Sequence, residues 1–110
     1  MSAGQLTQGR RIEHLDHSKP ADFCDDVEPG DYWKDDRGHW NVAAPVPRDD
    51  DGFLLSADVS TWKIVEHEDG TITVSPSMFF GMGGYPGYPP EWVAKHTWHG
   101  FLEHGVWREV

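Results

Sequence analysis

Two histidines close to the end of the chain, His96 and His99, have the residue type and spacing that could support metal binding or acid–base catalysis. On a helix such an HxxH pair shares one face and could hold a metal ion with a third ligand, for which His67, His104 and Cys24 are candidates. On a strand the two side chains point to opposite sides. The surrounding WVAKHTWHGFLEHGVWREV alternates as a strand does, so the pair is expected at the polar rim of a hairpin. A metal-dependent hydrolase built on His96 and His99 is the minor alternative.

Other catalytic arrangements are weaker still. His99 could be a general base oriented by Glu103 or Glu109, but the sequence offers no matching nucleophile. Ser75–Ser77, within TVSPS, is expected to be a strand end and not the strand–turn–helix elbow of a catalytic serine. GMGGYPG lacks the lysine and the hydroxyl residue of a phosphate-binding loop. We therefore expect no enzyme activity and no cofactor.

Charge limits the class of partner. The 110 residues contain 19 acidic and 9 basic side chains, giving a net charge of -10. Direct binding to nucleic acid or to an anionic membrane is disfavoured, whereas a basic protein partner is favoured. The single cysteine, Cys24, rules out an internal disulfide. No apolar run approaches about 18 residues, so no membrane-spanning helix is expected.

Carboxylates crowd the first half of the chain, and three interpretations of them stay open. They form a solvated face, a weak cation site at Asp49–Asp51, or a surface that imitates the phosphate backbone for a nucleic-acid-binding protein. The residues are Asp22, Asp25, Asp26, Glu28, Asp31, Asp35, Asp36, Asp49, Asp50, Asp51 and Asp58.

The order of elements predicts one domain preceded by an arm. Residues 1–19 hold few apolar side chains and are predicted to be an N-terminal arm that Ile12 and Leu15 could anchor. Residues 20–110 are predicted to be a single β-rich domain. A short helix is expected to begin near Ser18, because Ser18, a following proline and several acidic residues suit a helix start.

Three hairpins are predicted after that helix. The first joins runs containing Trp33 and Trp40 around DDRG. The second has Asp69 and Gly70 as a two-residue turn, which places Val65, Ile72 and Val74 together on the inward face. In the third, a strand ends near Leu102 and the next begins near Val106, with Gly105 supplying a positive φ. The residues expected there as core and sheet cover are Trp98, Phe101, Leu102, Val106 and Trp107.

A segment rich in glycine, proline and aromatic residues lies between the last two hairpins and is predicted to be a long loop over residues 81–90. Loops of this length are often binding segments. Folding of the loop onto its own tyrosines is the competing interpretation. The predicted contact residues, all of types common at interfaces, are Met78, Phe79, Phe80, Met82, Tyr85, Tyr88 and Trp92.

The fold class that these patterns predict is all-β, or a β-rich α+β fold. We expect a small hairpin-rich antiparallel sheet or sandwich with a short N-terminal helix and a long Gly/Pro/aromatic loop.

The phrases EHEDGTITVSPS and WHGFLEHGVWREV, with PGDYW upstream, resemble a family of small proteins of bacteria and actinobacterial phages that is known only as a domain of unknown function. The resemblance covers roughly residues 29–110. Several bacterial members carry cysteines, one of them two positions before the histidine that corresponds to His99, which implies a zinc site in those members. This chain has Thr97 there, so the resemblance implies that the site is lost here. It also implies a phage origin and a hairpin-based fold.

The expected function is that of a small phage-type accessory protein that binds another protein and modulates a host protein in the host cytoplasm. Two alternatives stay open. One is a structural or accessory component of the virion, for which self-association would be expected. The other is an acidic, nucleic-acid-mimicking inhibitor of a DNA- or RNA-binding protein.

Overall fold

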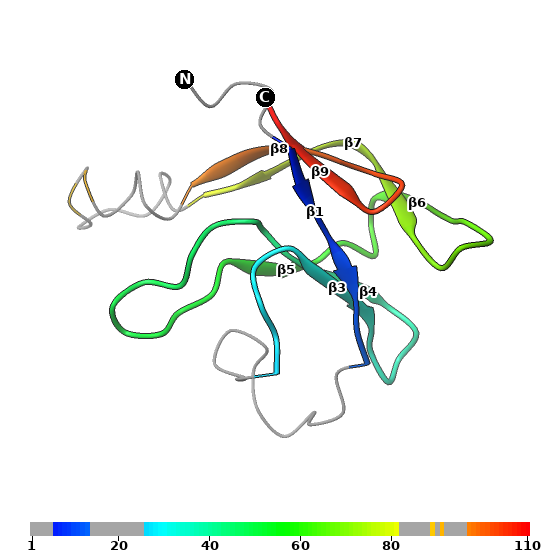
Figure 1. The fold of residues 1–110 in the computed structure, drawn as a ribbon, viewed down its shortest axis with the longest axis horizontal. Helices are drawn as coiled ribbons and strands as arrows, with labels where there is room; N and C mark the ends of the chain where they lie inside the picture. Colours follow the sequence, from blue (N-terminus) through cyan, green and yellow to red (C-terminus); the bar gives the residue numbers. More distant parts are fainter. Residues whose placement is uncertain (1–5, 14–25, 82–88, 90, 92–96) are drawn as a thin grey trace.

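The computed structural model describes residues 6–13, 26–81, 89, 91 and 97–110, and these form two β-sheets packed face to face (Figure 1). Sheet A has the strand order β1-β9-β8-β7-β6, and sheet B has the order β2-β3-β4-β5. The predicted all-β fold is confirmed. The predicted helix start at Ser18 lies outside the described residues. The strands are β1 Leu6–Gln8, β2 Arg10–Arg11, β3 Asp31–Lys34, β4 Trp40–Ala43, β5 Ser56–Asp58, β6 Lys63–Glu66, β7 Ile72–Phe80, β8 Trp98–Glu103 and β9 Val106–Glu109.

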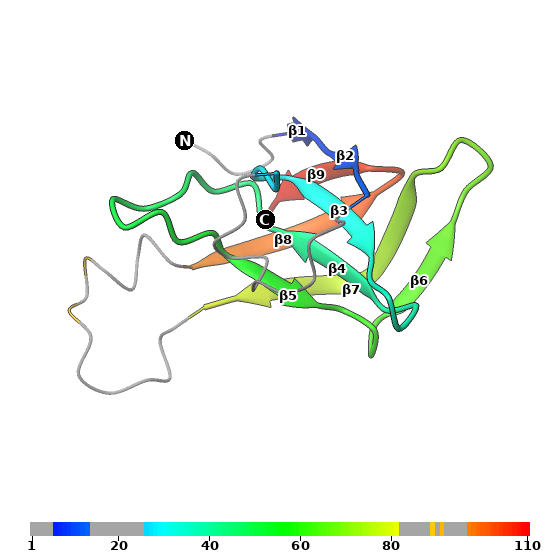
Figure 2. The ribbon, with the colours of Figure 1, turned by 90° about the horizontal axis from the view of Figure 1, so that it is seen from below.

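Residues 6–11, within the segment predicted to be an arm, cross from one sheet to the other. β1 pairs antiparallel with β9, and β2 pairs parallel with β3 (Figure 2). The crossing occurs at Gly9, where a Cβ atom would lie 2.6 Å from the carbonyl oxygen of Gly105. Arg10 holds β2 in place by donating to both carboxylate oxygens of the buried Asp31, at 3.1 and 2.8 Å. One side of the sandwich is thus closed by a continuous piece of chain.

The first predicted hairpin is confirmed. β3 and β4 pair antiparallel, with Trp33 opposite Asn41 and Lys34 opposite Trp40. Asp35 opens the turn by accepting hydrogen bonds from the backbone N–H groups of Arg37 and His39, both at 2.9 Å. A short polar side chain at the first position of a turn is favoured for this reason.

The second hairpin exists, but its predicted register was wrong by one residue. Ile64 lies opposite Val74, so Ile64 packs against the core, and Val65 is 43% exposed. Side chains alternate across a strand, so a shift of one residue exchanges the two faces.

The cause of the shift is the length of the turn. His67 closes the hairpin by donating its backbone N–H to the carbonyl oxygen of Thr71, which leaves a loop of three residues instead of the predicted two. Gly70 takes the left-handed conformation with φ 87°, and the carboxylate of Asp69 accepts from both the N–H and the hydroxyl of Thr71. A type I turn followed by a left-handed glycine is the usual three-residue hairpin loop.

β7 continues beyond the point where a strand end was predicted. The SPS segment does not terminate it, because the strand runs to Phe80. The pairing of β7 with β8 shifts register between Val74 and Met78, and Pro76 lies within that irregular stretch. Proline in a sheet is tolerated at such an irregularity, where its missing N–H costs no ladder hydrogen bond.

The closing hairpin agrees with its prediction. His104 and Gly105, with φ 48° and 75°, form a two-residue turn between β8 and β9. Both central residues of a type I′ turn need positive φ, and the twist of this turn matches that of the strands. Thr73 ties the turn to the neighbouring hairpin, since its hydroxyl accepts the N–H of His104 at 3.0 Å and lies 2.7 Å from Nε2 of His67.

The core lies between the sheets and is centred on Trp107. Its side chain is fully buried, packs edge-on against Trp98 at 5.3 Å between ring centroids, and donates its indole N–H to the carbonyl oxygen of Gly30 at 2.9 Å. The remaining buried members come from both sheets: Tyr32, Trp40, Val42, Ala44, Leu55, Val59, Ile72, Val74, Met78, Phe80 and Leu102.

A second, smaller cluster covers the other face of sheet B. Trp33 is buried there with Val27, Ala43 and Leu54, and Ile12 packs against them. Sheet B is therefore covered on both sides.

The bond between Trp107 and Gly30 predicts an effect on stability. Trp107→Phe leaves the carbonyl oxygen of Gly30 with only the longer hydrogen bond from the N–H of Arg10, at 3.4 Å, and removes ring volume, so the free energy of unfolding should fall by about 2–3 kcal/mol. Trp62→Phe is the matched control: its indole N–H donates to Ser77 at 3.3 Å in a partly buried position, and the loss should stay near 1 kcal/mol. Urea denaturation followed by fluorescence measures both, and equal losses would contradict the assigned role of Trp107.

Candidate binding surface

The face of sheet A that points away from the core is the candidate site, and we call it the outer face. It follows from the alternation along each strand: in β8, for example, Trp98, Gly100 and Leu102 are buried, whereas His99 and Glu103 are exposed and Phe101 is half-buried. The outer face consists of Leu6, Gln8, Lys63, Val65, Thr73, Ser75, Ser77, Phe79, His99, Phe101, Glu103, Val106, Arg108 and Val110.

Exposed apolar side chains concentrate on this face. Leu6 is 64% exposed, Val65 43%, Phe79 65% and Val110 56%, and these are the large apolar side chains that are exposed in the described part of the chain. All four belong to the outer face, with Leu6 opposite Arg108 and Val65 opposite Thr73. Scattered exposed apolar residues are ordinary, but their placement on one face makes that face the candidate interaction surface.

Aromatic and polar contacts organise the middle of the outer face. The rings of Phe79 and His99 meet edge to face with centroids 5.6 Å apart, and Nε2 of His99 lies 3.0 Å from the hydroxyl oxygen of Ser77. On the neighbouring strand, the guanidinium of Arg108 lies 4.3 Å from the centre of the Phe101 ring and forms an ion pair with Glu103 at 3.3 Å. Charge on this face is therefore largely balanced within it.

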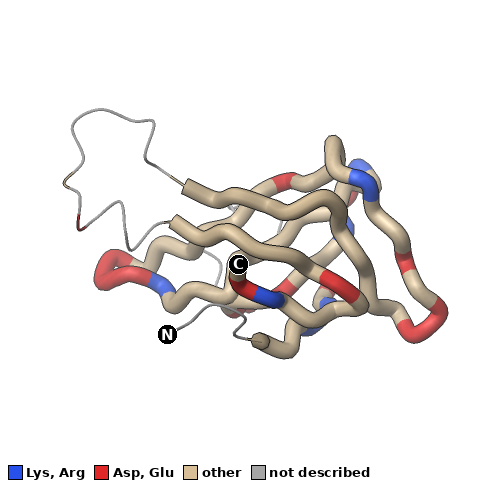
Figure 3. The backbone as a smooth tube through the Cα atoms, turned by 90° about the horizontal axis from the view of Figure 1, so that it is seen from above, with Lys and Arg blue, Asp and Glu red and all other residues tan. Residues whose placement is uncertain are grey.

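Few charged side chains belong to the outer face itself, although both halves of the sandwich are acidic. Figure 3 looks onto sheet A, whose strands carry few charged positions, while acidic positions gather at the far ends of the molecule. Residues 26–58, which contain most of sheet B, include nine Asp or Glu and three Lys or Arg. The outer face is thus the apolar, nearly neutral side of an acidic protein.

The predicted contact residues fall into three groups. Phe79 lies on the outer face, whereas Met78 and Phe80 are 1% and 6% exposed and belong to the core, because adjacent strand residues point to opposite sides. Met82, Tyr85, Tyr88 and Trp92 lie outside the described residues, as does most of the predicted loop. Phe79 is therefore the described member of the set that a partner could contact.

Of the two histidines in the predicted pair, His96 and His99, the structure describes only His99. His96 lies outside the described residues, and the ring of His99 contacts Ser77 and Phe79. In the described ranges, the group of side chains that could offer three metal ligands does not include His99. It consists of Asp35, His39 and Asp58, whose ligand atoms lie within 4.8 Å of one another.

The atoms of that group already have partners. Nδ1 of His39 lies 3.1 Å from Asp58, and Arg37 reaches the carboxylates of Asp35 and Asp58 at 3.5 and 3.7 Å. Asn41 donates its amide to Asp35 at 3.0 Å. A bound cation would need to displace Arg37 from both carboxylates. The group is a turn network in which Arg37 offsets part of the carboxylate charge.

Hydrogen bonding decides the protonation of Asp35. Burial acts to raise its pKa, but the backbone N–H of His39, the amide of Asn41 and the backbone N–H of Arg37 stabilise the carboxylate and bring its pKa down to about 2. Burial likewise acts to raise the pKa of Asp58, and hydrogen bonds from Ser60 and His39 outweigh it, so that the pKa is lowered. Both carboxylates keep their charge well into acid.

This network predicts a pH-dependent stability. The folded-state pKa of Asp35 lies below its unfolded value, so its contribution is present above pH ~4 and is lost as the pH falls toward 2. Asp35→Ala should lower the free energy of unfolding by about 1–3 kcal/mol at pH 7, and the difference from wild type should shrink near pH 2. The adjacent exposed Asp36→Ala should change it by less than about 0.5 kcal/mol. A difference that stays constant from pH 7 to pH 2 would contradict this assignment.

The predicted weak cation site at Asp49–Asp51 is a turn. Asp49 accepts the backbone N–H groups of Asp51 and Phe53 at 2.9 and 2.8 Å, and Gly52 supplies φ 84°. The carboxylate of Asp49 shapes the turn, as aspartate does at the start of many turns.

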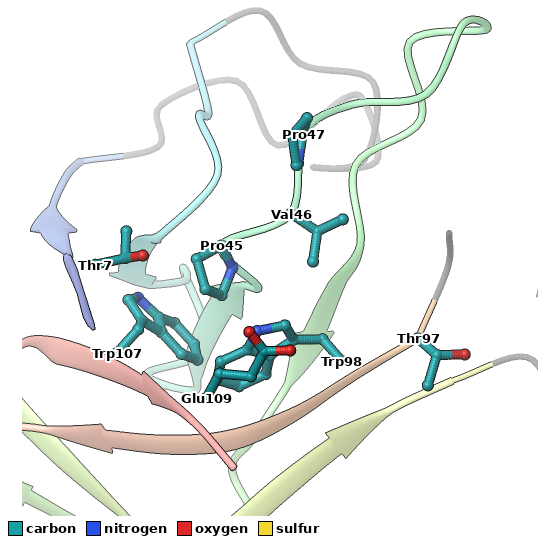
Figure 4. A pocket seen from close by; sticks show the side chains of 8 residues that line it. All are labelled: Thr7, Pro45, Val46, Pro47, Thr97, Trp98, Trp107 and Glu109. Atoms are coloured by element: carbon teal, nitrogen blue, oxygen red, sulfur yellow. The ribbon is translucent and has the colours of Figure 1, made fainter. Parts of the chain in front are cut away.

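A small cavity of about 190 Å³ opens between the sheets near the end of β9 (Figure 4). Trp98, Trp107 and Glu109 line it from sheet A, and Pro45 and Val46 line it from the segment after β4. Its volume is below the roughly 300–1,000 Å³ of ordinary small-molecule sites. It is a packing gap at the rim of the core.

Several outer-face residues were not singled out from the sequence. Phe101 and Val106 were predicted as core or sheet cover, and both are partly exposed on this face. The signal was present in the alternation of WHGFLE, which places Phe101 on the same side as His99. Val65 was assigned inward because the turn length was misjudged.

Neighbouring residues on β7 give a direct test of the two faces. Phe80→Ala should lower the free energy of unfolding by about 3–5 kcal/mol, because it opens a cavity in the core. In dilute solution, Phe79→Ala should change it by less than about 0.5 kcal/mol, because the side chain is exposed on the isolated chain. Chemical denaturation of both variants makes the comparison, and a large loss for Phe79→Ala would mean that this ring is packed.

Comparison with known proteins gives no indication of what this chain does. No protein-family model, curated protein or solved structure matches this chain. In the described ranges, no helix is long and apolar enough to cross a membrane. The resemblance to a family of phage and bacterial proteins stays a prediction.

Proposed function

We propose that this chain acts by binding another polypeptide through the outer face of sheet A, and not by catalysis. The observation that carries the proposal is the placement of Leu6, Val65, Phe79 and Val110 on one face of one sheet. Burying such side chains yields about 25 cal/mol per Å² of apolar area, which is the main favourable term in most protein association.

The two faces of the sandwich differ in a way that supports this proposal. The other side of sheet B is covered by the cluster around Trp33, so its apolar residues are already buried. On the outer face, four large apolar side chains remain exposed to solvent: Leu6, Val65, Phe79 and Val110. Exposed apolar side chains on one face supply area that a partner can bury.

The polar groups of the outer face suit recognition better than catalysis. Ser77 and His99 are within hydrogen-bonding distance, but a nucleophile of this kind also needs a carboxylate to orient the histidine and donors for an oxyanion. The carboxylate of Glu103 instead pairs with Arg108. Aromatic residues and arginine, here Phe79, Phe101 and Arg108, are typical anchors of protein interfaces.

The biological setting inferred from the sequence belongs to the same proposal. An accessory protein that modulates a host protein in the host cytoplasm and a component of the virion both act through a protein contact. They differ in the identity of the partner, and the outer face suits either role.

A second candidate rests on the other half of the molecule. Nine carboxylates in residues 26–58 make the sheet B half a ligand for a basic surface, as expected of a protein that imitates nucleic acid. Several of these groups serve the fold, however, since Asp31 pairs with Arg10 and Asp35 caps a turn. We therefore place this candidate second.

Site-specific photocrosslinking tests the main proposal. The variant Phe79→p-benzoyl-phenylalanine, expressed in the cells in which this protein naturally occurs and irradiated there, should yield a covalent adduct with a polypeptide. The same substitution at the exposed Asp36, on the β3–β4 turn, is the control and should yield far less adduct. Failure of position 79 to give an adduct, or equal yields from the two positions, would contradict binding through the outer face.

A further inference from the structure

We propose that the partner of the outer face is a second copy of this chain, and that two sheets A pack face to face in a two-fold symmetric dimer. The inference rests on the proposed function, because it names the occupant of the same surface. Its basis is the distribution of charge together with the size of the face.

The charge on the outer face does not select a basic partner. Arg108 is paired with Glu103, and Lys63 adds a further positive charge on the edge strand β6. A basic protein would be drawn to the nine carboxylates of residues 26–58, and these belong to the sheet B half. The partner of the outer face should itself present an apolar, nearly neutral surface, which this chain does.

Face-to-face pairing also keeps the acidic halves of the two copies apart. In a stack of four sheets spaced by about 10 Å, the two sheets B lie about 30 Å from each other. The Debye length at physiological salt is about 8 Å, so repulsion between the two acidic halves is largely screened. The net charge of -10 on each chain is therefore compatible with this arrangement.

The size of the face fits a stable interface. The five strands of sheet A contain 26 residues, which at a strand spacing of about 4.8 Å and a rise of about 3.3 Å per residue cover about 410 Å² in projection. The accessible area of such a corrugated face is larger than its projection and is of the same order as the roughly 800 Å² that each partner buries in a standard interface.

The residues of the outer face can complement those of a second copy related by a two-fold axis. A symmetric interface presents the same patch twice, so it needs a surface that complements itself. The outer face offers apolar side chains on β1, β6, β7 and β9, and its central ion pair between Arg108 and Glu103 carries one charge of each sign. Two copies can bury Phe79 and Phe101 while each Arg108 keeps Glu103 as its partner, and Lys63 lies on the edge strand β6, at the margin of the face.

Sedimentation equilibrium on the purified chain tests the proposal. Complexes with standard-size interfaces have dissociation constants of micromolar or below, so at about 100 μM the mass should be twice the monomer mass of 12.5 kDa. The dimer should survive a rise in salt from about 50 to 500 mM, because its contacts are apolar.

Phe79→Glu locates the interface. The substitution buries an unpaired charge and should weaken the dimer at least about 30-fold, while the circular dichroism spectrum stays as in wild type because the position is exposed on the isolated chain. Asp36→Lys, on the β3–β4 turn, is the matched control and should leave the dimer intact.

The possible outcomes are distinct. A monomer at every concentration, or a dimer that Phe79→Glu leaves unchanged, would overturn the proposal. If the chain is monomeric but position 79 crosslinks to a polypeptide of another mass, the proposed binding function stands and only the identity of the partner is wrong.

Discussion

The hydrogen bond from the buried indole of Trp107 to the carbonyl oxygen of Gly30 is the contact on which the sandwich depends. It joins β9 of sheet A to the residue that precedes β3 of sheet B, at the point where the chain also crosses between the sheets through Gly9. A side chain at position 9 would collide with the carbonyl oxygen of Gly105. The backbone at position 9 can therefore approach Trp107 only because residue 9 is glycine. One large ring thus sets the distance between the sheets.

This arrangement explains why one face of the molecule is left in solvent. Trp98 and Trp107 of sheet A pack between the sheets with Tyr32 and Trp40 of sheet B, and sheet B buries Trp33 on its other face. Sheet A has no corresponding cover in the described part of the chain, so the alternation of its strands leaves Phe79 and Val65 exposed. The candidate binding surface is a consequence of the same strand geometry that builds the core.

Several of the acidic side chains have structural roles in the fold, so their number alone is a poor guide to what they do. Asp35, Asp49, Asp58 and Asp69 each accept backbone N–H groups at a turn, and these hydrogen bonds favour the charged form of a carboxylate. Asp31 is buried against Arg10. Counting charges in the sequence therefore overstates how much of the acidity is available to a partner, although the exposed tip at Asp50 and Asp51 remains.

The sequence by itself determined the fold class and the existence of three hairpins, because strand alternation and turn residues are local properties. It predicted core and sheet cover for a set of five residues, of which three are buried and two, Phe101 and Val106, lie on the outer face. It did not determine the register of the β6–β7 hairpin, since two- and three-residue loops both accept Asp-Gly and the choice exchanges Val65 with Ile64. Only the tertiary structure showed that residues 6–11 join the two sheets, because pairing with β9 and β3 involves residues far away in the chain. Only the tertiary structure, likewise, brought Leu6, Val65, Phe79 and Val110 onto one face, because strands that are distant in sequence are neighbours in sheet A.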